Sequence, residues 1–359
     1  MKIVFLLTEV AVGGAERVVL DLCTQYKAQF HKVSVISLKS VKKDDIMVQA
    51  FHKEGIKIYS LNVDKKHFWR VLGLKRLVYA LAPNIVSSHL FHPNLLSRLL
   101  LGNRNFKLVN TIHIMEIRPS QKWRFIADYL TFRSADLYTA VSQAAADFQE
   151  KALRLRKGTV KVIRNGIRPV KLLNTDDIAE LRSKWGVDDC DYVLGSVGRL
   201  NHQKGYDLLL NMTDKICNEI KNRRIGLVFI GDGPELENLK KLAQKAPHRM
   251  KIVFAGYSAN AASECGAFDV FLMPSRFEGF GLTFIEAQAH GMPCVVQNIP
   301  PLAEIAAHYP NAILTDFEHT PYVAAQNIAD AVKKQRLAAV YVPTIEKMAE
   351  TYMKFFKEF

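Results

Sequence analysis

The sequence predicts an α/β protein built from two doubly wound, Rossmann-like domains. Its 359 residues exceed what one hydrophobic core commonly holds, so two domains are expected. Short apolar runs of strand length alternate with helical patterns through both halves, which is typical of parallel sheets covered by helices. No uninterrupted apolar run reaches about 18 residues, and a membrane-spanning helix is therefore not expected.

The elements follow in order along the chain. In the first half, strands are predicted at residues 2–7, 32–38, 56–60, 84–87, 108–112 and 137–141. In the second half, they are predicted at residues 160–163 or 192–197, then at 226–231, 251–255, 269–273 and 293–296. We place one domain at residues 1–165 and the other at residues 170–340. A last helix is predicted over residues 345–359, with apolar Met348, Tyr352, Phe355 and Phe356 at helical spacing.

The most informative stretch joins an apolar strand to a helix through a glycine-containing loop. The loop holds Phe280 and Gly281, and the helix is expected to begin near Leu282. A helix N-terminus offers unpaired backbone N–H groups and a positive dipole end to an anion. Glu278 precedes this point and Glu286 lies one turn into the helix, so an anion held there has a carboxylate on each side. Such an arrangement suits a ligand with hydroxyls beside its phosphates, which describes a nucleotide sugar.

A second loop carries two cations of the kind that bind diphosphates. The strand at residues 192–197 runs into a loop with Arg199 and Lys204, and an apolar helix is expected to start near Asp207. Arginine provides a planar fork of donors and lysine a mobile point charge. We predict that both hold a diphosphate and that both lie on a surface loop.

Glycines and histidines follow strands of the first half. Gly13 and Gly14 stand directly before an amphipathic helix and permit a close approach of the backbone. His89, His92 and His113 follow two later strands. Ligands of open α/β sheets bind outside the carboxyl ends of strands, so all three histidines are candidate site residues.

Together these segments resemble the retaining glycosyltransferases of family 4, which have the GT-B fold of two Rossmann-like domains facing a cleft. The resemblance spans nearly the whole chain and is most specific around Glu278, Glu286, Arg199 and Lys204. It implies transfer of a hexose from a UDP- or GDP-sugar to an acceptor hydroxyl in the cleft, with retention of configuration. It also implies that the helix at 345–359 crosses back onto the first domain.

The resemblance further implies a role for each site residue. The residues expected to catalyse transfer are His113, Arg199, Lys204 and Glu278. Those expected to bind the donor are Gly13, Gly14, Arg199, Lys204, Glu278, Phe280, Gly281, Leu282 and Glu286. In these roles Glu278 binds sugar hydroxyls, Glu286 the donor ribose, and His113 the sugar near its anomeric carbon. For His89 and His92 three roles remain open, namely shaping the acceptor side, capping a helix, or packing as hydrogen-bonded side chains.

One turn departs from the family pattern, in which Gly-Gly-x-x-Glu often follows the strand at 293–296. Here the turn reads Ile299-Pro300-Pro301-Leu302-Ala303-Glu304. Two prolines remove two amide donors, which leaves the choice of base and sugar open. The acidic cluster at residues 188–191 does not follow a strand, so we expect no obligatory metal ion and no cofactor besides the donor.

Charge is distributed unevenly along the chain. Residues 1–170 hold 28 Lys and Arg against 12 Asp and Glu, a net charge of +16, and the remainder has a net charge of −2. Cations alternate with aromatic and apolar residues at 65–77, 121–126 and 154–157. The segment 65–77 can form an amphipathic helix with one basic and one apolar face, although its apolar residues could instead face the core. Such clusters suit docking on anionic lipid, and no nucleic-acid motif is recognised.

We therefore expect a cytoplasmic protein, peripheral on the inner face of the cytoplasmic membrane, that acts on a membrane-associated glycan or lipid-linked acceptor. The N-terminus does not have the pattern of a signal peptide. Five scattered cysteines without metal-ligand spacing indicate a reducing compartment and buried small side chains. Two other classes remain open: a sugar-nucleotide epimerase of the same architecture, whose acid/base carboxylates are not evident, and a non-catalytic nucleotide-sugar-binding protein, against which the glutamate pair argues.

Overall fold

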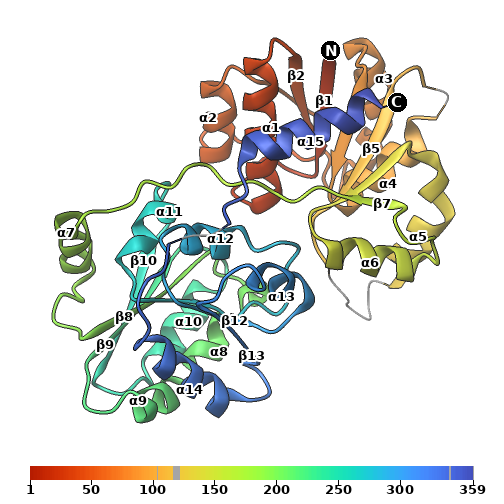
Figure 1. Ribbon diagram of the computed structural model, residues 1–359. Coiled ribbons are helices and arrows are strands. Elements are labelled where there is room, and N and C mark those ends of the chain that lie inside the picture. Colours follow the sequence, from red (N-terminus) through yellow and green to blue (C-terminus); the bar gives the residue numbers. More distant parts are fainter. Residues whose placement is uncertain (103, 116–121, 339–340, 359) are drawn as a thin grey trace. The chain divides into compact units, whose positions relative to one another are not determined.

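The structure, a computed structural model, describes residues 1–102, 104–115, 122–338 and 341–358. The chain forms two compact units, one comprising Met1–Gly166 with Pro343–Phe359 and the other Ile167–Val342 (Figure 1). Each unit is built around one sheet in which every strand pairing is parallel. The predicted fold class, two doubly wound α/β domains, is confirmed.

The first unit has a sheet of seven strands. In spatial order these are β3 (Lys57–Ser60), β2 (Lys32–Ser37), β1 (Lys2–Leu7), β4 (Ile85–His89), β5 (Lys107–Ile112), β6 (Leu137–Ala140) and β7 (Val160–Val162). The helices are α1 (Gly14–Ala28), α2 (Ile46–Lys53), η1 (Phe68–Leu72), α3 (Gly73–Leu81), α4 (Phe91–Leu100), α5 (Lys122–Thr131), η3 (Phe132–Ser134), α6 (Gln143–Ala152) and α15 (Ile345–Lys357).

Both faces of this sheet are covered, which explains why β1 is a continuous apolar run from Ile3 to Leu7. From β1, Val4 and Leu6 pack into a core cluster with Leu74 and Val78 of α3. On the opposite face, the ring of Phe5 stacks on Tyr26 of α1 at a centroid distance of 6.4 Å.

The second unit has a sheet of six strands. In spatial order these are β10 (Met250–Gly256), β9 (Ile225–Ile230), β8 (Tyr192–Val197), β11 (Val270–Met273), β12 (Cys294–Gln297) and β13 (Ala312–Thr315). The helices are α7 (Thr175–Trp185), η4 (His202–Lys204), α8 (Tyr206–Leu210), α9 (Thr213–Glu219), α10 (Leu236–Ala243), α11 (Ala261–Glu264), η5 (Cys265–Ala267), α12 (Leu282–Ala289), α13 (Pro300–Ala306) and α14 (Pro321–Ala331).

Two strand assignments differ from the prediction. The runs at 160–163 and 192–197 were alternatives for one strand of the second half, but both form strands, and the first of them closes the sheet of the first unit as β7. The edge strand β13 was not predicted. It is only four residues long, Ala-Ile-Leu-Thr, and Leu314 is exposed, so it is a short strand at the edge of the sheet.

The prediction of one amphipathic helix over residues 65–77 is wrong in its bounds. Asp64 accepts hydrogen bonds from the backbone N–H groups of Lys66 and His67, which fixes a turn. A 3₁₀ helix follows at η1, and the α-helix begins only at Gly73. Phe68, Trp69 and Leu72 consequently remain exposed instead of facing the core.

The last helix packs within the first unit against α1. The hydroxyl of Tyr26 donates to the carbonyl of Ala349 at 3.0 Å, and Tyr352 and Phe356 are buried. The chain leaves this unit and re-enters it at one place, where a Cβ added to Gly166 would lie 2.1 Å from the backbone of Thr344. Only glycine permits this crossing without displacement.

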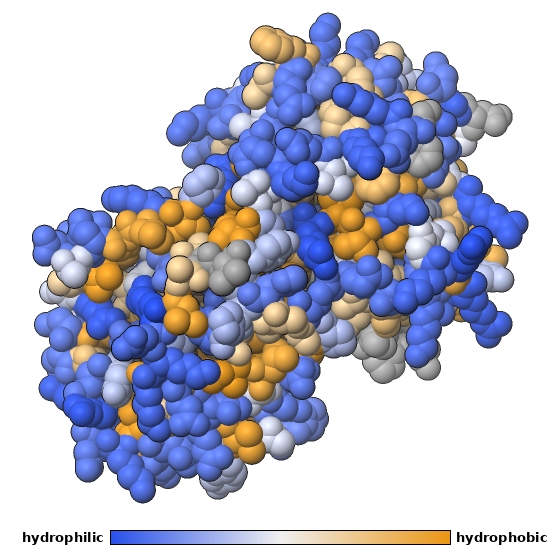
Figure 2. All heavy atoms as spheres, in the orientation of Figure 1, coloured by the Kyte–Doolittle hydropathy of each residue, from blue (hydrophilic) through white to orange (hydrophobic). Residues whose placement is uncertain are grey.

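The visible surface is mainly hydrophilic, and apolar residues interrupt it in separate patches (Figure 2).

Among the helices that the structure describes, none combines the length and apolar character needed to cross a bilayer. All five cysteines are free thiols. Cys23, Cys217, Cys265 and Cys294 are buried as expected, whereas Cys190 is only partly buried.

Candidate active site

In each sheet, most of the predicted site residues follow the two strands between which the strand order reverses, and His113 follows the next strand, β5. In the second unit, the chain runs outward from β8 to β9 and β10, then returns to β11 on the other side of β8. The loops after β8 and β11 therefore leave neighbouring strands at the same edge of the sheet. Such a switch point is where open α/β sheets bind ligands.

These two loops are held together by backbone and side-chain contacts. Gly205 has φ +65°, and a Cβ at this position would lie 2.2 Å from the carbonyl oxygen of Pro274. Arg276 donates from its backbone N–H to the carbonyl of Gln203 at 2.8 Å, and its guanidinium binds both carboxylate oxygens of Asp207, at 2.8 and 2.7 Å. No motif in the sequence marks Arg276, Gln203 and Asp207, which together clamp the two loops to each other.

The clamp brings two predicted site residues into contact. Nζ of Lys204 lies 2.6 Å from Oε1 of Glu278, and both side chains are largely buried, with exposed fractions of 17% and 9%. Lys204 is thus not the exposed surface cation that the sequence led us to expect. Arg199 is exposed, as predicted, and the described part of the chain provides it with no ion pair.

The N-terminus of α12 has the features predicted for an anion site. Its N-cap is Gly281, with φ +92°, and no side chain caps the helix. The hydroxyl of Thr283 in the first turn is buried without a hydrogen-bond partner among the described residues, and so is that of Ser275 at the end of β11. Unsatisfied buried hydroxyls of this kind are expected where a bound ligand supplies the partner.

Two predicted donor-binding residues are less accessible than the sequence suggested. The ring of Phe280 is buried, which leaves its backbone as the part that can contact a ligand. Glu286 is also buried, on α12. A Cβ at Gly281 would lie 2.6 Å from Leu302, so the proline-containing turn that departs from the family pattern packs directly against this helix N-terminus. That turn continues as α13, which begins at Pro300.

In the first unit, the switch point lies between β1 and β4. The loop after β1 ends at Gly13 and Gly14, where α1 begins without a side-chain cap. The carboxylate of Glu16 folds back over Gly13, since a Cβ there would lie 2.3 Å from its Oε2. A small residue at position 13 therefore leaves room for Glu16.

His89 and His113 form a buried pair at the ends of β4 and β5. Nδ1 of His89 lies 2.7 Å from Nε2 of His113, and Nε2 of His89 lies 3.0 Å from the hydroxyl oxygen of Ser87. Burial lowers the pKa of His113 to about 4 and lowers that of His89 well below its ordinary value, so both rings are neutral at pH 7. His92 is exposed in the first turn of α4. Neither His89 nor His92 caps α4, because the N-cap residue is Leu90 and no side chain forms a capping hydrogen bond.

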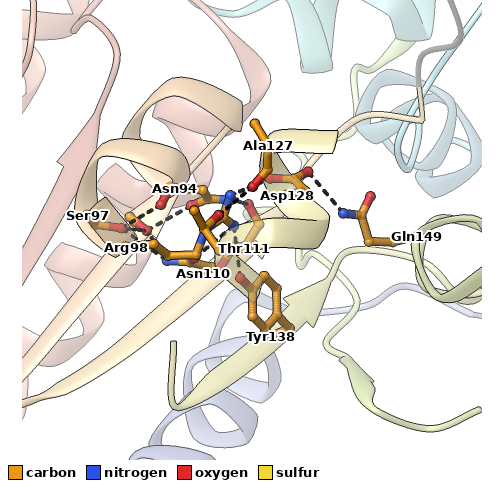
Figure 3. Close-up of polar contacts among 11 residues, drawn as sticks. Asn94, Ser97, Arg98, Asn110, Thr111, Ala127, Asp128, Tyr138 and Gln149 are labelled. Carbon is orange, nitrogen blue, oxygen red and sulfur yellow. Dashed lines mark hydrogen bonds and ion pairs between the residues drawn. The ribbon is translucent and has the colours of Figure 1, made fainter. Parts of the chain in front are cut away.

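A buried polar network on α4 anchors α5 to the sheet (Figure 3). The guanidinium of Arg98 donates to Asp128, to the amide oxygen of Asn110 at 3.2 Å and to the hydroxyl of Tyr138 at 2.9 Å. Gln149 of α6 donates to the second oxygen of Asp128 at 3.1 Å. No motif marked these residues in the sequence.

This anchor leaves the apolar side of α5 facing outward. Between Trp123 and Thr131 of this helix, only Asp128 is buried, whereas the exposed fractions of Trp123, Ile126, Tyr129 and Leu130 run from 50% to 75%. Gln121, which belongs to the predicted basic and aromatic cluster at 121–126, lies outside the described residues.

The acidic cluster at 188–191 forms ion pairs at the N-terminal ends of the strands of the second sheet, away from the loops after β8 and β11. Asp191 lies 2.9 Å from Arg223, and Asp189 lies 2.5 Å from Arg224, ahead of β8 and β9. Within the described residues, no group of three or more His, Cys, Asp and Glu side chains is arranged to hold a metal ion.

Comparison with known proteins agrees with this architecture. The structure is similar over its whole length to the crystal structure of HepE from Anabaena in complex with UDP and glucose, with a TM-score of 0.78, 21% sequence identity and full coverage of both chains. At this level of identity the match supports the GT-B fold.

Among curated relatives, an uncharacterised glycosyltransferase of Methanocaldococcus jannaschii is 32% identical over 52% of this chain and 48% of its own length. The alpha-monoglucosyldiacylglycerol synthase of Streptococcus pneumoniae is also 32% identical, over 52% of this chain and 42% of its own length. The chain thus spans less than half of the length of both relatives.

Two family models together cover most of the sequence. Residues 12–171 match the family described as Glycosyltransferase Family 4, and residues 177–348 match Glycosyl transferases group 1. With the two sheets and the loops at their switch points, these matches establish that the chain belongs to the family 4 glycosyltransferases of the GT-B fold.

Proposed function

We propose that this protein transfers a hexose from a nucleoside diphosphate sugar, UDP- or GDP-linked, to a hydroxyl of a membrane-associated glycan or lipid-linked acceptor, with retention of configuration. The observation that carries the proposal is the Lys204–Glu278 pair just ahead of the uncapped N-terminus of α12. A cation for phosphate and a carboxylate for hydroxyls are adjacent there, which suits a ligand that carries both groups.

The site residues then act on the charges that develop during transfer. Negative charge builds on the leaving diphosphate while the sugar becomes oxocarbenium-like. Arg199, Lys204 and the N–H groups at the start of α12 stabilise the diphosphate, and such preorganised donors act most strongly in the transition state. Glu278 accepts hydrogen bonds from sugar hydroxyls, Glu286 binds the donor ribose, and His113 contacts the sugar. Gly13 and Gly14 place the N-terminus of α1 against the donor phosphates.

Thermal unfolding with a panel of UDP- and GDP-sugars tests donor binding. A ligand at about 100 times its Kd stabilises the folded state by about 2.7 kcal/mol, which raises the melting temperature measurably. The donor that binds is then incubated with acceptor extracts, and proton NMR of an early product reads the anomeric configuration. Inversion would contradict the proposed class. Epimerised donor in the absence of acceptor would indicate an epimerase instead, and binding without turnover would indicate a non-catalytic protein.

The membrane part of the proposal rests on the surface of the first unit. Exposed Phe68, Trp69 and Leu72 of η1 stand beside exposed cations, and α5 presents its own row of apolar side chains. Aromatic residues next to Lys and Arg favour an anionic bilayer surface, where each cation contributes roughly 1 kcal/mol. The relative from Streptococcus pneumoniae is named for a diacylglycerol product, which agrees with a lipid acceptor. We place the protein on the cytoplasmic face of the membrane.

Sedimentation with vesicles tests this docking. The wild type should bind vesicles that contain anionic lipid, and binding should weaken as salt shortens the Debye length below about 10 Å. Replacing the exposed cations Lys65, Lys66, Arg70, Lys75 and Arg76 with Ser should release the protein. A control with the same number of exposed lysines of the second unit replaced, Lys240, Lys241, Lys245, Lys333 and Lys334, should still bind. Failure of the wild type to sediment at low salt would make a soluble acceptor the better choice.

A further inference from the structure

The hydrogen bonds of the His89–His113 pair determine which ring nitrogens carry protons. Nε2 of His113 is hydrogen-bonded to His89, so Nδ1 is the nitrogen of His113 that can contact a ligand. Nδ1 forms no hydrogen bond with any residue that the structure describes, although His113 keeps an exposed fraction of 8%. Whether Nδ1 donates or accepts depends on which ring carries the proton shared between His89 and His113.

Two arrangements of the protons are possible when both rings are neutral. In the first, the Ser87 hydroxyl donates to Nε2 of His89, the Nδ1–H of His89 donates to Nε2 of His113, and His113 carries a proton on Nδ1. In the second, each bond is reversed: His113 donates from Nε2, His89 donates from Nε2 to Ser87, and Nδ1 of His113 is a bare acceptor. Because burial keeps the pKa of both histidines low, neither arrangement competes with a charged pair at neutral pH.

Ser87 distinguishes the two arrangements. Its side chain is fully buried, and its one hydrogen bond in the described part of the chain is to His89. In the first arrangement, the hydroxyl proton has an acceptor. In the second, His89 occupies the oxygen as a donor, and the hydroxyl proton is left without an acceptor in a buried site. A buried donor without a partner disfavours the second arrangement by roughly one to two orders of magnitude in population.

We propose that Ser87 and His89 are positioning residues that fix His113 as the Nδ1–H tautomer, so that His113 presents a neutral hydrogen-bond donor to an oxygen of the donor sugar. The proposal rests on the proposed function in one respect, the identity of the ligand. The ring of Phe5, 5.7 Å from that of His89 between centroids, packs beside the pair and helps to keep water from the shared proton. His113 then acts by orientation and polarity and does not remove a proton.

The tautomers can be observed directly, without any substrate. In protein labelled with ¹⁵N in its 11 histidines, two-bond proton–nitrogen correlations distinguish Nδ1–H from Nε2–H rings. Spectra of a His113→Gln variant and a His89→Asn variant assign the two signals. We expect both His89 and His113 of the wild type to be neutral Nδ1–H tautomers at pH 7. An Nε2–H or doubly protonated His113 would overturn the proposal.

A pair of serine variants tests how the direction is set. Ser87→Ala removes the hydroxyl, so that both arrangements then leave one nitrogen of His89 without a partner, and a mixture of His113 tautomers should appear. Ser88→Ala is the matched control, because the Ser88 hydroxyl lies on the same strand but bonds Asn94 at 2.8 Å and not the histidines. The Ser88→Ala spectrum should retain the wild-type tautomers. Unchanged tautomers in Ser87→Ala would refute the role of Ser87.

The consequence for transfer is measured separately. His89→Asn keeps an N–H donor near the position of Nδ1 and should retain the His113 tautomer and most of the transfer rate. His89→Leu removes the donor and should lower kcat/KM by roughly tenfold, the loss expected when one hydrogen bond to the transition state is weakened. Equal losses in His89→Asn and His89→Leu would contradict the positioning role. If the tautomers are as expected but no donor is turned over, the proposed function fails while the positioning role stands.

Discussion

Replacing Lys204 in the Lys204–Glu278 pair should lower both the stability of the fold and the rate of transfer, for two different reasons. Lys204→Met leaves the Glu278 carboxylate buried beside a methionine, with an exposed fraction of 9% and without its partner at 2.6 Å. Breaking a buried ion pair from one side typically costs about 3–5 kcal/mol. The lower end applies here, because Lys204 is 17% exposed. For a unit of this size, about 3 kcal/mol corresponds to a decrease in melting temperature on the order of 10 °C.

A double variant separates the two effects. Lys204→Met combined with Glu278→Gln removes the stranded charge and should recover about 2 kcal/mol of the lost stability. Transfer should not recover, because a cation for the leaving diphosphate is still missing and Glu278, which is proposed to bind sugar hydroxyls, is replaced as well. In Lys204→Met alone, transfer should fall about hundredfold, or about 2.7 kcal/mol at the transition state, and in the double variant at least as much.

Arg199→Ala is the comparison, because Arg199 is exposed. Its unfolding free energy should change by no more than about 0.5 kcal/mol, while transfer should fall about hundredfold. Urea unfolding and initial rates at saturating acceptor measure both quantities. Near-normal turnover in Lys204→Met and Arg199→Ala would refute the diphosphate assignment. If the double variant is no more stable than Lys204→Met, the unpaired Glu278 carboxylate is not the source of the instability.

Three further outcomes are expected. The pKa of His113 falls from about 6.5 in an unfolded chain to about 4 in the fold, so the unfolded state binds the proton first as the pH drops. About 3 kcal/mol of stability is therefore present above pH 6.5 and lost between about pH 6.5 and 4, and urea unfolding of His113→Gln over this range should lack that part of the slope. Asp128→Ala should destabilise the first unit by about 3–5 kcal/mol, because it leaves Arg98 buried without its carboxylate, and thermal unfolding of the variant checks this. Transfer should be unaffected by EDTA, and a rate that falls on chelation and returns with a divalent ion would contradict a metal-independent reaction.

The sequence predicted most of the strands, because strands buried on both faces, such as β1, β9 and β11, are largely apolar runs. The four-residue edge strand β13, Ala-Ile-Leu-Thr, was missed. What the sequence could not provide was the pairing of residues. Lys204 and Glu278 are 74 positions apart, Arg276 and Asp207 are 69 apart, and His89 and His113 are 24 apart. Each pair meets because neighbouring strands end at the same edge, and no local periodicity records that register.

The packing of α15 has a consequence for how the chain is made. The second unit is one continuous stretch, Ile167–Val342, and all of it is synthesised before the first unit is complete. The first unit buries Tyr26 against residues that emerge after the whole second unit, since Ala349 lies 323 positions after Tyr26. During synthesis, the first unit therefore lacks α15, which leaves part of α1 uncovered, at a time when all strands of the second sheet have been made. Domains that fold during synthesis usually do so from the N-terminus, and in this chain the order of completion is reversed.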